Sequence, residues 1–170
     1  GSEMCIRDRG KMIYLIDNSS DTKIPALHYQ LGTINDVVKY CEDKKVLGVD
    51  TETEGFDFTC KKMIMFQIGD ENNQYIIDTR TISIEPLREI LEGNVTKIFH
   101  NAKFDYKFIK KWAGITCESI YDTFLSERVI NCGKDGVRYG LKDVCKKYLK
   151  VELNKEVRNQ FIGLTVQPFK

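Results

Sequence analysis

The sequence contains no long apolar run, few prolines and little glycine, and each of these absences excludes a class of protein. Its apolar runs are shorter than the 18 residues that a membrane-spanning helix needs, and the start of the chain lacks the apolar stretch of a signal peptide. With 3 Pro and 12 Gly in 170 residues, 42% of them hydrophobic, the composition is unlike that of disordered or collagen-like chains. We therefore expect one soluble intracellular domain with a sizeable core.

Cysteine and histidine are arranged in a way that excludes several kinds of catalytic centre. None of the six cysteines forms a Cys-x-x-Cys pair, and the only histidines are His28 and His100, which argues against a zinc site. Irregular cysteine spacing in a chain of this length also argues against a disulfide framework, so reduced thiols are expected. The sequence has no Gly-rich loop of the P-loop form, and two histidines offer no convincing Ser-His-Asp or Cys-His arrangement.

The formal net charge of +1 conceals an uneven distribution of charge along the chain. Residues 1–100 carry 12 Lys and Arg against 17 Asp and Glu, whereas residues 101–170 carry 14 against 8. A carboxylate-rich half joined to a basic half suits a protein that binds a polyanion and also holds cations. Ordinary solvated helices near the C-terminus explain the same charges equally well.

Hydrophobic periodicity predicts a single α/β domain over residues 11–170. Residues 1–10 show no such period, begin with a Gly-Ser that resembles a cleavage scar, and are interpreted as disordered tag or cloning sequence. Strands followed by a strand–helix unit and then by helices predict a central mixed β-sheet flanked by helices. The expected strands are 12–16, 46–51, 63–69, 74–78, 97–100 and a short piece at 119–121, the second to fourth forming an antiparallel meander. The expected helices are 34–43 after an N-cap at Thr33, 85–91, 102–112, 123–130, 141–149 and a last turn at 156–161.

The strand at 46–51 ends in two carboxylates, Asp50 and Glu52. Side chains alternate between the faces of a strand, so both project from the same side. Two carboxylates at this spacing repel each other and resist desolvation, and a divalent cation removes both problems. Hard oxygen ligands suit Mg²⁺ or Mn²⁺. Solvated turn residues just after the end of the strand are the alternative.

The helix at 102–112 contains a third misplaced carboxylate, Asp105. On a helical wheel it falls inside the apolar arc, between Ile109 and Trp112, where a lone aspartate is costly unless it is paired or binds a metal. A role at the helix N-terminus, through the helix dipole, is the alternative. The apolar arc carries the large side chains Phe104, Phe108, Ile109 and Trp112. The opposite arc carries the four lysines Lys103, Lys107, Lys110 and Lys111. Three convergent carboxylates would support two-metal phosphoryl chemistry.

Four motifs in order resemble those of the DEDD-type 3′–5′ exonucleases. Val49-Asp50-Thr51-Glu52-Thr53 resembles the first motif, and His100-Asn101-Ala102-Lys103-Phe104-Asp105 resembles the second. The later runs Tyr121-Asp122-Thr123-Phe124-Leu125-Ser126 and Gly140-Leu141-Lys142-Asp143-Val144 also match. The resemblance covers about residues 25–160 and is strongest to the proofreading domain of family A (polymerase I type) DNA polymerases.

This resemblance implies a ribonuclease H-like fold and hydrolysis of DNA 3′ ends with two Mg²⁺ or Mn²⁺ ions. It implies that Asp50 bridges both metals, that Glu52 binds the metal with the attacking water, and that Asp105 holds the other. A cytoplasmic location in a bacterial or phage-infected cell and a polymerase domain in the full-length protein are further expectations. The residues expected to bind single-stranded DNA are Thr51, Thr53, Asn101, Lys103, Phe104 and Lys107. A catalytically impaired single-strand-binding module and an RNase D-type exoribonuclease are the alternatives.

The sequence departs from the family pattern at its C-terminal end. The third motif, with the fourth carboxylate and a Tyr or His, normally lies downstream of the Gly-Leu-Lys-Asp segment, and the sequence reaches Lys170 without it. We therefore expect a C-terminally truncated domain whose two-metal site is only partly occupied. Asp122 is a weak candidate for the missing ligand because it is placed as a helix N-cap. Asp143 is another weak candidate, because its helix is expected to bury Leu141, Val144, Tyr148 and Leu149.

Overall fold

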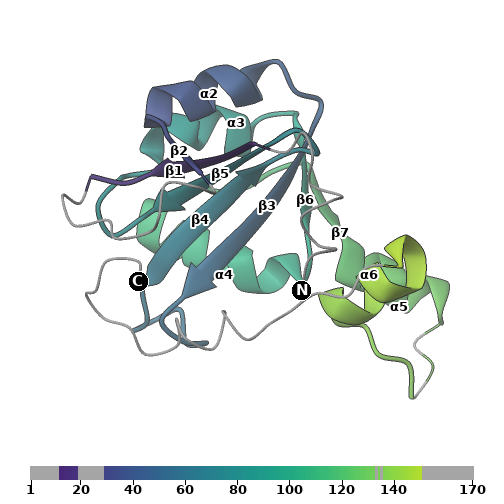
Figure 1. The fold of residues 1–170 in the computed structure, drawn as a ribbon. Helices are drawn as coiled ribbons and strands as arrows, with labels where there is room; N and C mark the ends of the chain where they lie inside the picture. Colours follow the sequence, from purple (N-terminus) through teal and green to yellow (C-terminus); the bar gives the residue numbers. More distant parts are fainter. Residues whose placement is uncertain (1–11, 19–28, 133, 135, 151–170) are drawn as a thin grey trace.

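The computed structural model describes residues 12–18, 29–132, 134 and 136–150 (Figure 1). The predicted tag at 1–10, His28 and the predicted last helical turn at 156–161 lie outside the described residues. Within the described part, no helix is both long enough and apolar enough to cross a membrane.

A seven-stranded mixed sheet with the order β2-β1-β5-β4-β3-β6-β7 forms the centre of the molecule (Figure 1). The central strands β3, β4 and β5 are antiparallel to their neighbours in the meander, which confirms that prediction. Parallel pairs join β1 to β5, β1 to β2, β3 to β6 and β6 to β7. The strands are β1 (Met12–Ile16), β2 (Gln30–Leu31), β3 (Val46–Thr53), β4 (Met63–Gly69), β5 (Asn73–Asp78), β6 (Thr96–Phe99) and β7 (Ile120–Asp122).

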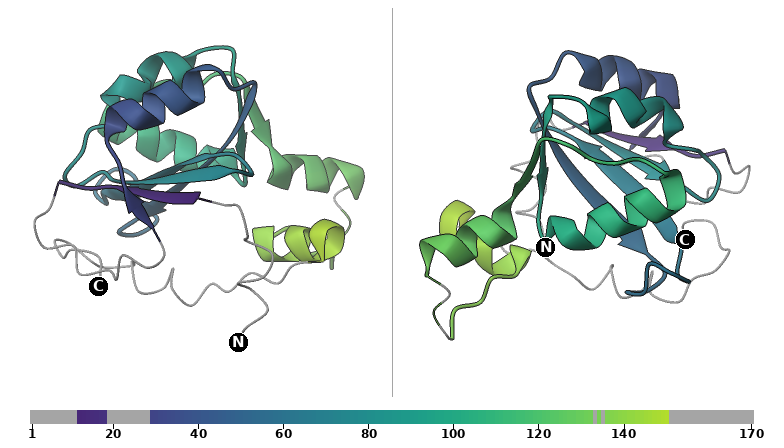
Figure 2. Two further views of the ribbon diagram at one scale, coloured as in Figure 1. Left: turned by 45° about the horizontal axis from the view of Figure 1, so that its top comes forward. Right: turned by 180° about the vertical axis from the view of Figure 1, so that it is seen from behind.

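The helices form two groups around the sheet. The first three helices and α4 supply side chains to one large core cluster on a single face of the sheet, whereas α5 and α6 lie together beside β7 (Figure 2). The helix predicted at 85–91 is divided into a 3₁₀ turn with a proline at its start and a short α-helix. The helices are α2 (Ile34–Glu42), η1 (Glu85–Leu87), α3 (Arg88–Glu92), α4 (Ala102–Ala113), α5 (Thr123–Ile130) and α6 (Leu141–Leu149).

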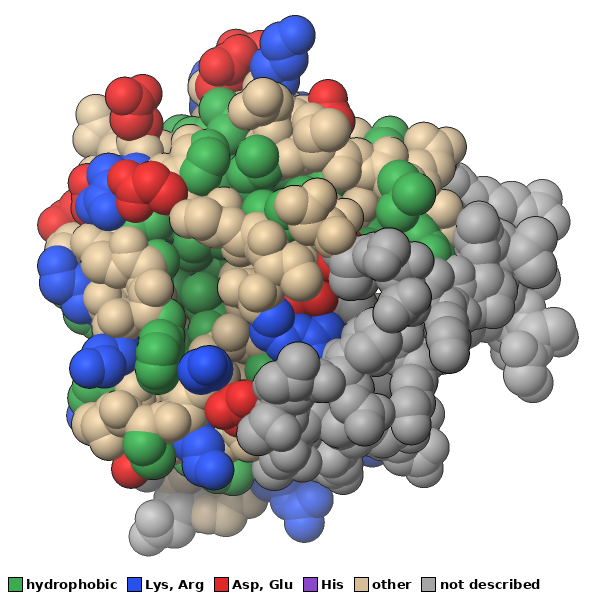
Figure 3. All heavy atoms as spheres, turned by 90° about the vertical axis from the view of Figure 1, so that its left-hand side faces the viewer, with side chains coloured by type: hydrophobic (Ala, Val, Ile, Leu, Met, Phe, Trp, Pro, Cys, Tyr) green, Lys and Arg blue, Asp and Glu red, His purple; other side chains and the backbone are tan. Residues whose placement is uncertain are grey.

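The surface on the β1 side of the sheet does not carry charge of one sign. Figure 3 views the molecule from the left-hand side of Figure 1 and shows Lys and Arg side chains mixed with Asp and Glu side chains, with hydrophobic side chains between them. The uneven charge along the sequence therefore does not make the described part of this face uniformly acidic.

Strand β3 lies inside the sheet, where it pairs with β4 on one side and with β6 on the other. Leu47, Val49, Thr51 and Thr53 are buried, while the side chains between them face the other side. The parallel pairing with β6 runs from Val46 to Gly48, so the end of β3 extends past the end of β6. The chain turns out of β6 into α4 at this level.

Helix α4 has the two-sided character that its sequence predicts, with one exception. Asp105, Phe108 and Ile109 are buried, and the four lysines are exposed. Trp112 was expected in the apolar arc, but it is 40% exposed. The reason is a hydrogen bond, since its Nε1–H donates to the carbonyl oxygen of Lys61 at 2.9 Å and holds the ring at the protein surface.

The prediction that α6 buries an apolar face is wrong. Leu141, Tyr148 and Leu149 are exposed, and none of the nine residues of α6 is fully buried. The helix is attached to α5 by an ion pair, 2.6 Å between Lys147 Nζ and Glu127 Oε1, instead of packing over the sheet.

Lys97 on β6 is fully buried, which no sequence pattern predicts. Its ammonium group donates to the carbonyl oxygens of Ile90 at 3.0 Å and Gly93 at 2.8 Å, at the C-terminal end of α3. Burial lowers the pKa of this amine. The ammonium therefore acts as a cap for carbonyl groups that end a helix.

We expect Lys97→Met to lower the free energy of unfolding by about 1–3 kcal/mol, because two carbonyl groups lose their partner. Urea denaturation of this variant and of Lys45→Met, which removes an exposed lysine, measures the difference. Equal stability of the two variants would contradict the capping role of Lys97.

Candidate functional site

Asp50 and Glu52 occupy the outward-facing positions at the end of β3. Asp50 is paired across the sheet with Gln67 of β4, and Glu52 with Met65. Asp50 lines a hollow of about 260 Å³ that extends from β3 to the start of α5 and of α6. The polar groups that share this hollow with Asp50 are Gln67, Gln74, His100 and Thr123. The predicted shared face of Asp50 and Glu52 is therefore present at the open side of the sheet.

Asp105 is attached to β3 at the residue between these two carboxylates. The backbone N–H of Thr51 donates to Asp105 Oδ1 at 3.0 Å, and the Thr51 hydroxyl donates to the same oxygen at 2.6 Å. This contact is possible because β3 extends beyond its pairing with β6, so the helix supplies an acceptor to the strand edge. Asp105 is only 3% exposed, which confirms that the carboxylate faces the core.

The environment of Asp105 disfavours its charged form. Burial, and then the negative charge of Asp50, raise its pKa to about 7, while the hydrogen bonds from Thr51 oppose this rise. The charge of Asp50 acts on Asp105, so the two carboxylates are electrostatically coupled. A cation between them would relieve the repulsion and restore the ionised form of Asp105.

The turn from β6 into α4 is fixed by Asp122. Its two carboxylate oxygens accept the backbone N–H groups of Asn101 at 3.0 Å and Ala102 at 2.8 Å. The same carboxylate accepts from Phe124 and Leu125 at the start of α5, which confirms the predicted N-cap role. Asp122 thus joins two helix N-termini, and the first of these two contacts was not predicted because it depends on a partner 21 residues away.

Asn101 has the left-handed backbone conformation, with φ 67° and ψ 56°. Asn adopts this conformation more readily than most residues do. Because Asp122 supplies the cap of α4, the Asn101 side chain is exposed and lines a surface hollow. The Nδ1 atom of the neighbouring His100 lies 2.9 Å from the Thr123 hydroxyl. That hydroxyl donates a hydrogen bond to the carbonyl oxygen of Phe99.

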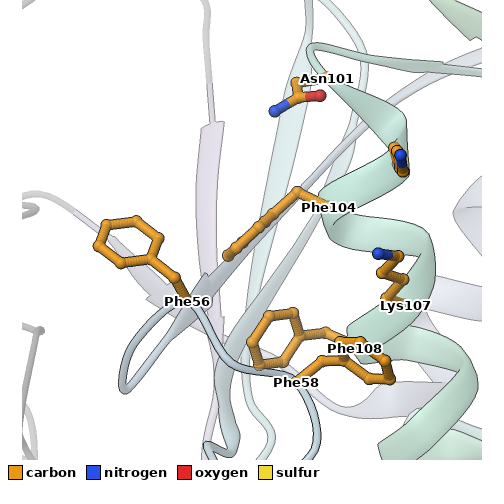
Figure 4. A pocket seen from close by; sticks show the side chains of 7 residues that line it. Phe56, Phe58, Asn101, Phe104, Lys107 and Phe108 are labelled. Atoms are coloured by element: carbon orange, nitrogen blue, oxygen red, sulfur yellow. The ribbon is translucent and has the colours of Figure 1, made fainter.

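An aromatic hollow of about 200 Å³ lies between α4 and the loop that follows β3. Figure 4 shows the ring of Phe104 reaching from α4 toward Phe56, with Asn101 at the start of the helix and Phe108 beside Phe58. The ring centroids of Phe56 and Phe104 are 6.2 Å apart in an edge-on arrangement, and Phe56 is largely exposed. Lys107 Nζ lies 5.2 Å from the centroid of Phe58. The residues that line this aromatic hollow are Phe56, Phe58, Asn101, Lys103, Phe104, Lys107 and Phe108.

The aromatic hollow brings together four of the six residues that we predicted to contact nucleic acid: Asn101, Lys103, Phe104 and Lys107. The other two are buried and bonded inside the protein. Thr51 holds Asp105, and the Thr53 hydroxyl donates to the carbonyl oxygen of Gly55 at 2.6 Å. Sequence reasoning missed Phe56 and Phe58, although two aromatic residues in a polar loop directly after the first motif are a recognisable signal.

The metal-binding arrangement is incomplete among the described residues, in which no three His, Cys, Asp or Glu side chains are grouped closely enough to hold one ion. Asp105 accepts both hydrogen bonds of Thr51 on the inward side of β3, whereas Asp50 and Glu52 face outward. The carboxylate oxygens nevertheless suit a hard divalent cation. Asp50 and Glu52 share a face of β3, and the negative charge of Asp50 contributes to the raised pKa of Asp105. Asp143 lies in the first turn of α6, where its Oδ2 is close to Gly140.

Comparison with known proteins gives matches over most of the chain. A family model described as 3′–5′ exonuclease matches residues 29–160. DNA polymerase I from Aquifex aeolicus is 30% identical over 130 residues, which make up 76% of this chain and 21% of the polymerase. Exosome complex component 10 from Homo sapiens is 26% identical over 130 residues, 75% of this chain and 14% of that protein. The chain thus spans only a small part of the length of these relatives.

Solved structures share the fold at low sequence identity. The catalytic core of RRP6 from Trypanosoma brucei matches with a TM-score of 0.71 and 18% identity, over 92% of this chain and 40% of that one. Brucella melitensis NrnC with bound Mg²⁺ matches with a TM-score of 0.61 and 18% identity, over 90% of this chain and 73% of that one. NrnC bound to pGG matches with a TM-score of 0.65 and 20% identity, over 92% of this chain and 69% of that one. These matches confirm the predicted ribonuclease H-like fold with a mixed sheet flanked by helices.

The raised pKa of Asp105 predicts how the stability of the metal-free protein depends on pH. Between the ordinary aspartate value of 3.8 and about 7, the folded protein holds a proton that the unfolded chain releases. Stability therefore falls as the pH rises through this window. With a chelator present, we expect the melting temperature to fall from pH 4 to pH 7 in the wild type and in Glu71→Gln, and to fall less in Asp105→Asn. Parallel pH profiles for all three proteins would contradict this origin.

Asp122 and Asp143 both lie at the start of a helix, but the double cap at Asp122 predicts that it contributes much more to the free energy of unfolding. Asp122→Ala removes the acceptor of four backbone N–H groups, and we expect it to lower the free energy of unfolding by about 1–2 kcal/mol or more. Asp143→Ala should change it by less than about 0.5 kcal/mol. Chemical denaturation compares the two variants, and a cost at Asp143 equal to that at Asp122 would refute the assignment.

Proposed function

The chain belongs to the 3′–5′ exonuclease family, and we propose that it releases nucleotides from the 3′ end of single-stranded DNA by metal-assisted attack of water on the terminal phosphodiester bond. The observation that carries this proposal is that Asp105 of α4 is hydrogen-bonded to Thr51, the residue of β3 that stands between the outward-facing Asp50 and Glu52. Carboxylates provide the hard oxygen ligands that phosphoryl transfer with divalent cations requires.

Asp50, Glu52 and Asp105 are the residues that would hold Mg²⁺ or Mn²⁺. Such ions, when bound, activate a water molecule and neutralise charge on the phosphate. Asp50 lines the open hollow and would contribute to the binding of both ions, while Glu52 lies two residues further on the same face. Asp105 is the most buried of the three, and its ionised form is the one that would bind a cation. NrnC, a protein of the same fold, has been solved with bound Mg²⁺, which supports the proposal.

The aromatic hollow is the proposed binding place for the last nucleotides of the strand. Phe56 and Phe104 offer ring surfaces on which bases stack without regard to sequence. Lys103 and Lys107 lie on the same helix at positions from which an ammonium group can contact a phosphate. Asn101 adds a polar group at the start of the helix. The solved complex of NrnC with pGG supports nucleotide binding on this fold.

An exoribonuclease activity is the second candidate, and the similarity to exosome complex component 10 favours it. The groups that line the aromatic hollow are aromatic rings, lysines and one amide, and these do not by themselves distinguish RNA from DNA. A polymerase domain in the natural protein is likewise a proposal, supported by the similarity to DNA polymerase I.

The test measures mononucleotide release from 5′-labelled single-stranded DNA and RNA of equal sequence, with Mg²⁺, Mn²⁺ or a chelator. We expect metal-dependent release from the 3′ end, faster with DNA. Asp50→Asn should reduce the rate at least about 100-fold, because loss of a direct metal ligand costs more than loss of an outer-shell partner. Asp43→Asn, at the exposed end of α2, is the matched control and should retain the wild-type rate.

The outcomes separate the candidates. Faster release from RNA would replace the deoxyribonuclease proposal with the exoribonuclease one. Binding of both strands without release in any metal would show a single-strand-binding module. Release that survives a chelator, or that is unchanged in Asp50→Asn, would contradict the proposed chemistry.

A further inference from the structure

A third hollow, of about 380 Å³, lies at the other end of α4 from Asn101. It shares no lining residue with the aromatic hollow or with the hollow that contains Asp50. We call it the Trp112 hollow, after the side chain of α4 that lines it. The other residues that matter for its chemistry are Lys62, Met63, Arg80, Ile82 and Ser83.

Trp112 is the only tryptophan of the chain, and it is held in a position that suits stacking. Its one polar group, Nε1–H, is satisfied by the carbonyl oxygen of Lys61, yet 40% of the residue stays exposed. Tryptophan is enriched at binding interfaces because its ring offers a large apolar surface beside a polar N–H group. Met63 and Ile82 supply apolar surface next to it.

The charges around the Trp112 hollow favour an anion. Lys62 is exposed and lines the hollow, and Arg80 lines it as well. The guanidinium of Arg80 is paired with the buried Asp78, at 2.9 Å between Nε and Oδ1, so this aspartate is already neutralised. Asp17 is the other acidic group that acts on Arg80. Lys62 is the other cation that lines the hollow, and the carboxylate of Glu54 near it accepts the backbone N–H of Lys62 at 3.1 Å.

The aromatic hollow and the Trp112 hollow both lie along α4 and the loop between β3 and β4. Phe104, Phe108 and Trp112 follow each other at four-residue intervals, which places them on the same side of α4. The loop between β3 and β4 runs beside them and contacts the helix three times, as Phe56 with Phe104, Phe58 with Phe108, and Lys61 with Trp112. Helix geometry separates Phe104 from Trp112 by about 12 Å. That distance corresponds to about three stacked nucleotides at roughly 3.4 Å each.

We propose that the Trp112 hollow binds a nucleotide of the single strand upstream of the 3′ end, with its base stacked on Trp112 and its phosphate on Lys62. This inference rests on the proposed function, because the 3′ end is placed at the carboxylates beside the start of α4. The strand then runs from the aromatic hollow toward the C-terminal end of α4. A dinucleotide is too short to reach the Trp112 hollow, whereas a strand of six or more nucleotides reaches it.

The fluorescence of the single tryptophan reports on this hollow directly. With a chelator present to prevent hydrolysis, oligothymidylates of two and eight nucleotides are titrated onto the protein. We expect the octamer to quench Trp112 and the dimer to leave it unchanged. Binding of a 5′-labelled octamer is then measured by fluorescence anisotropy. Trp112→Ala should weaken it about 5-fold or more, because stacking contributes about 1–3 kcal/mol per base.

Matched variants keep the outcome independent of folding and of catalysis. Trp112→Phe should restore part of the affinity, and Lys62→Ala should weaken octamer binding while the control Lys39→Ala on α2 does not. Dimer hydrolysis in Mn²⁺ should be unchanged in Lys62→Ala. If Trp112→Ala does not fold, as judged by circular dichroism, Lys62→Ala and the wild-type quenching decide the question.

Two results would overturn the inference. One is equal quenching by dimer and octamer, or none by either, while the wild type hydrolyses both. The other is unchanged octamer affinity in Lys62→Ala and in a folded Trp112 variant. Length-dependent quenching without any hydrolysis would instead retain this binding site and reject the proposed nuclease function.

Discussion

The two hydrogen bonds from Thr51 to Asp105 are the constraint on which the site depends. They exist because β3 extends past β6, which leaves a strand N–H group for the helix to bind. Residues alternate along β3, so the Thr51 hydroxyl points inward to Asp105 while Asp50 and Glu52 point outward. The end of β3 thereby carries two carboxylates on its outward side and binds a third, Asp105, on its inward side. The cost is a buried aspartate whose pKa is raised to about 7, and a bound cation would offset that cost.

Regular elements could be predicted from the sequence because each carries a strong local signal. The period of α4 put Asp105 in its apolar arc, and the alternation along β3 put Asp50 and Glu52 on one face; the structure agrees with both. The N-cap of α2 by Thr33 and that of α5 by Asp122 were also predictable, because a cap depends on residues only two or three positions away.

The features that were missed depend on partners far away in the sequence. The second role of Asp122, at the start of α4, needs the placement of β7 beside β6. The position of Trp112 at the surface needs the carbonyl of Lys61. Helix α6 has an apolar stripe, but a stripe predicts burial only if another element covers it, and α6 is held by Lys147 and Glu127 instead. Phe56 and Phe58 belong to a loop, where periodicity gives no information.

We propose that Asp50 and Asp105 contribute to one cation site, although Asp105 is hydrogen-bonded to Thr51 in the structure. Titration of Mn²⁺, followed by electron paramagnetic resonance, tests this claim most directly in the wild type, Asp50→Asn, Asp105→Asn and the surface control Glu118→Gln. Both site variants should lose Mn²⁺ affinity by about 10-fold or more, while the control binds Mn²⁺ as the wild type does. Wild-type Mn²⁺ affinity in Asp105→Asn would contradict it.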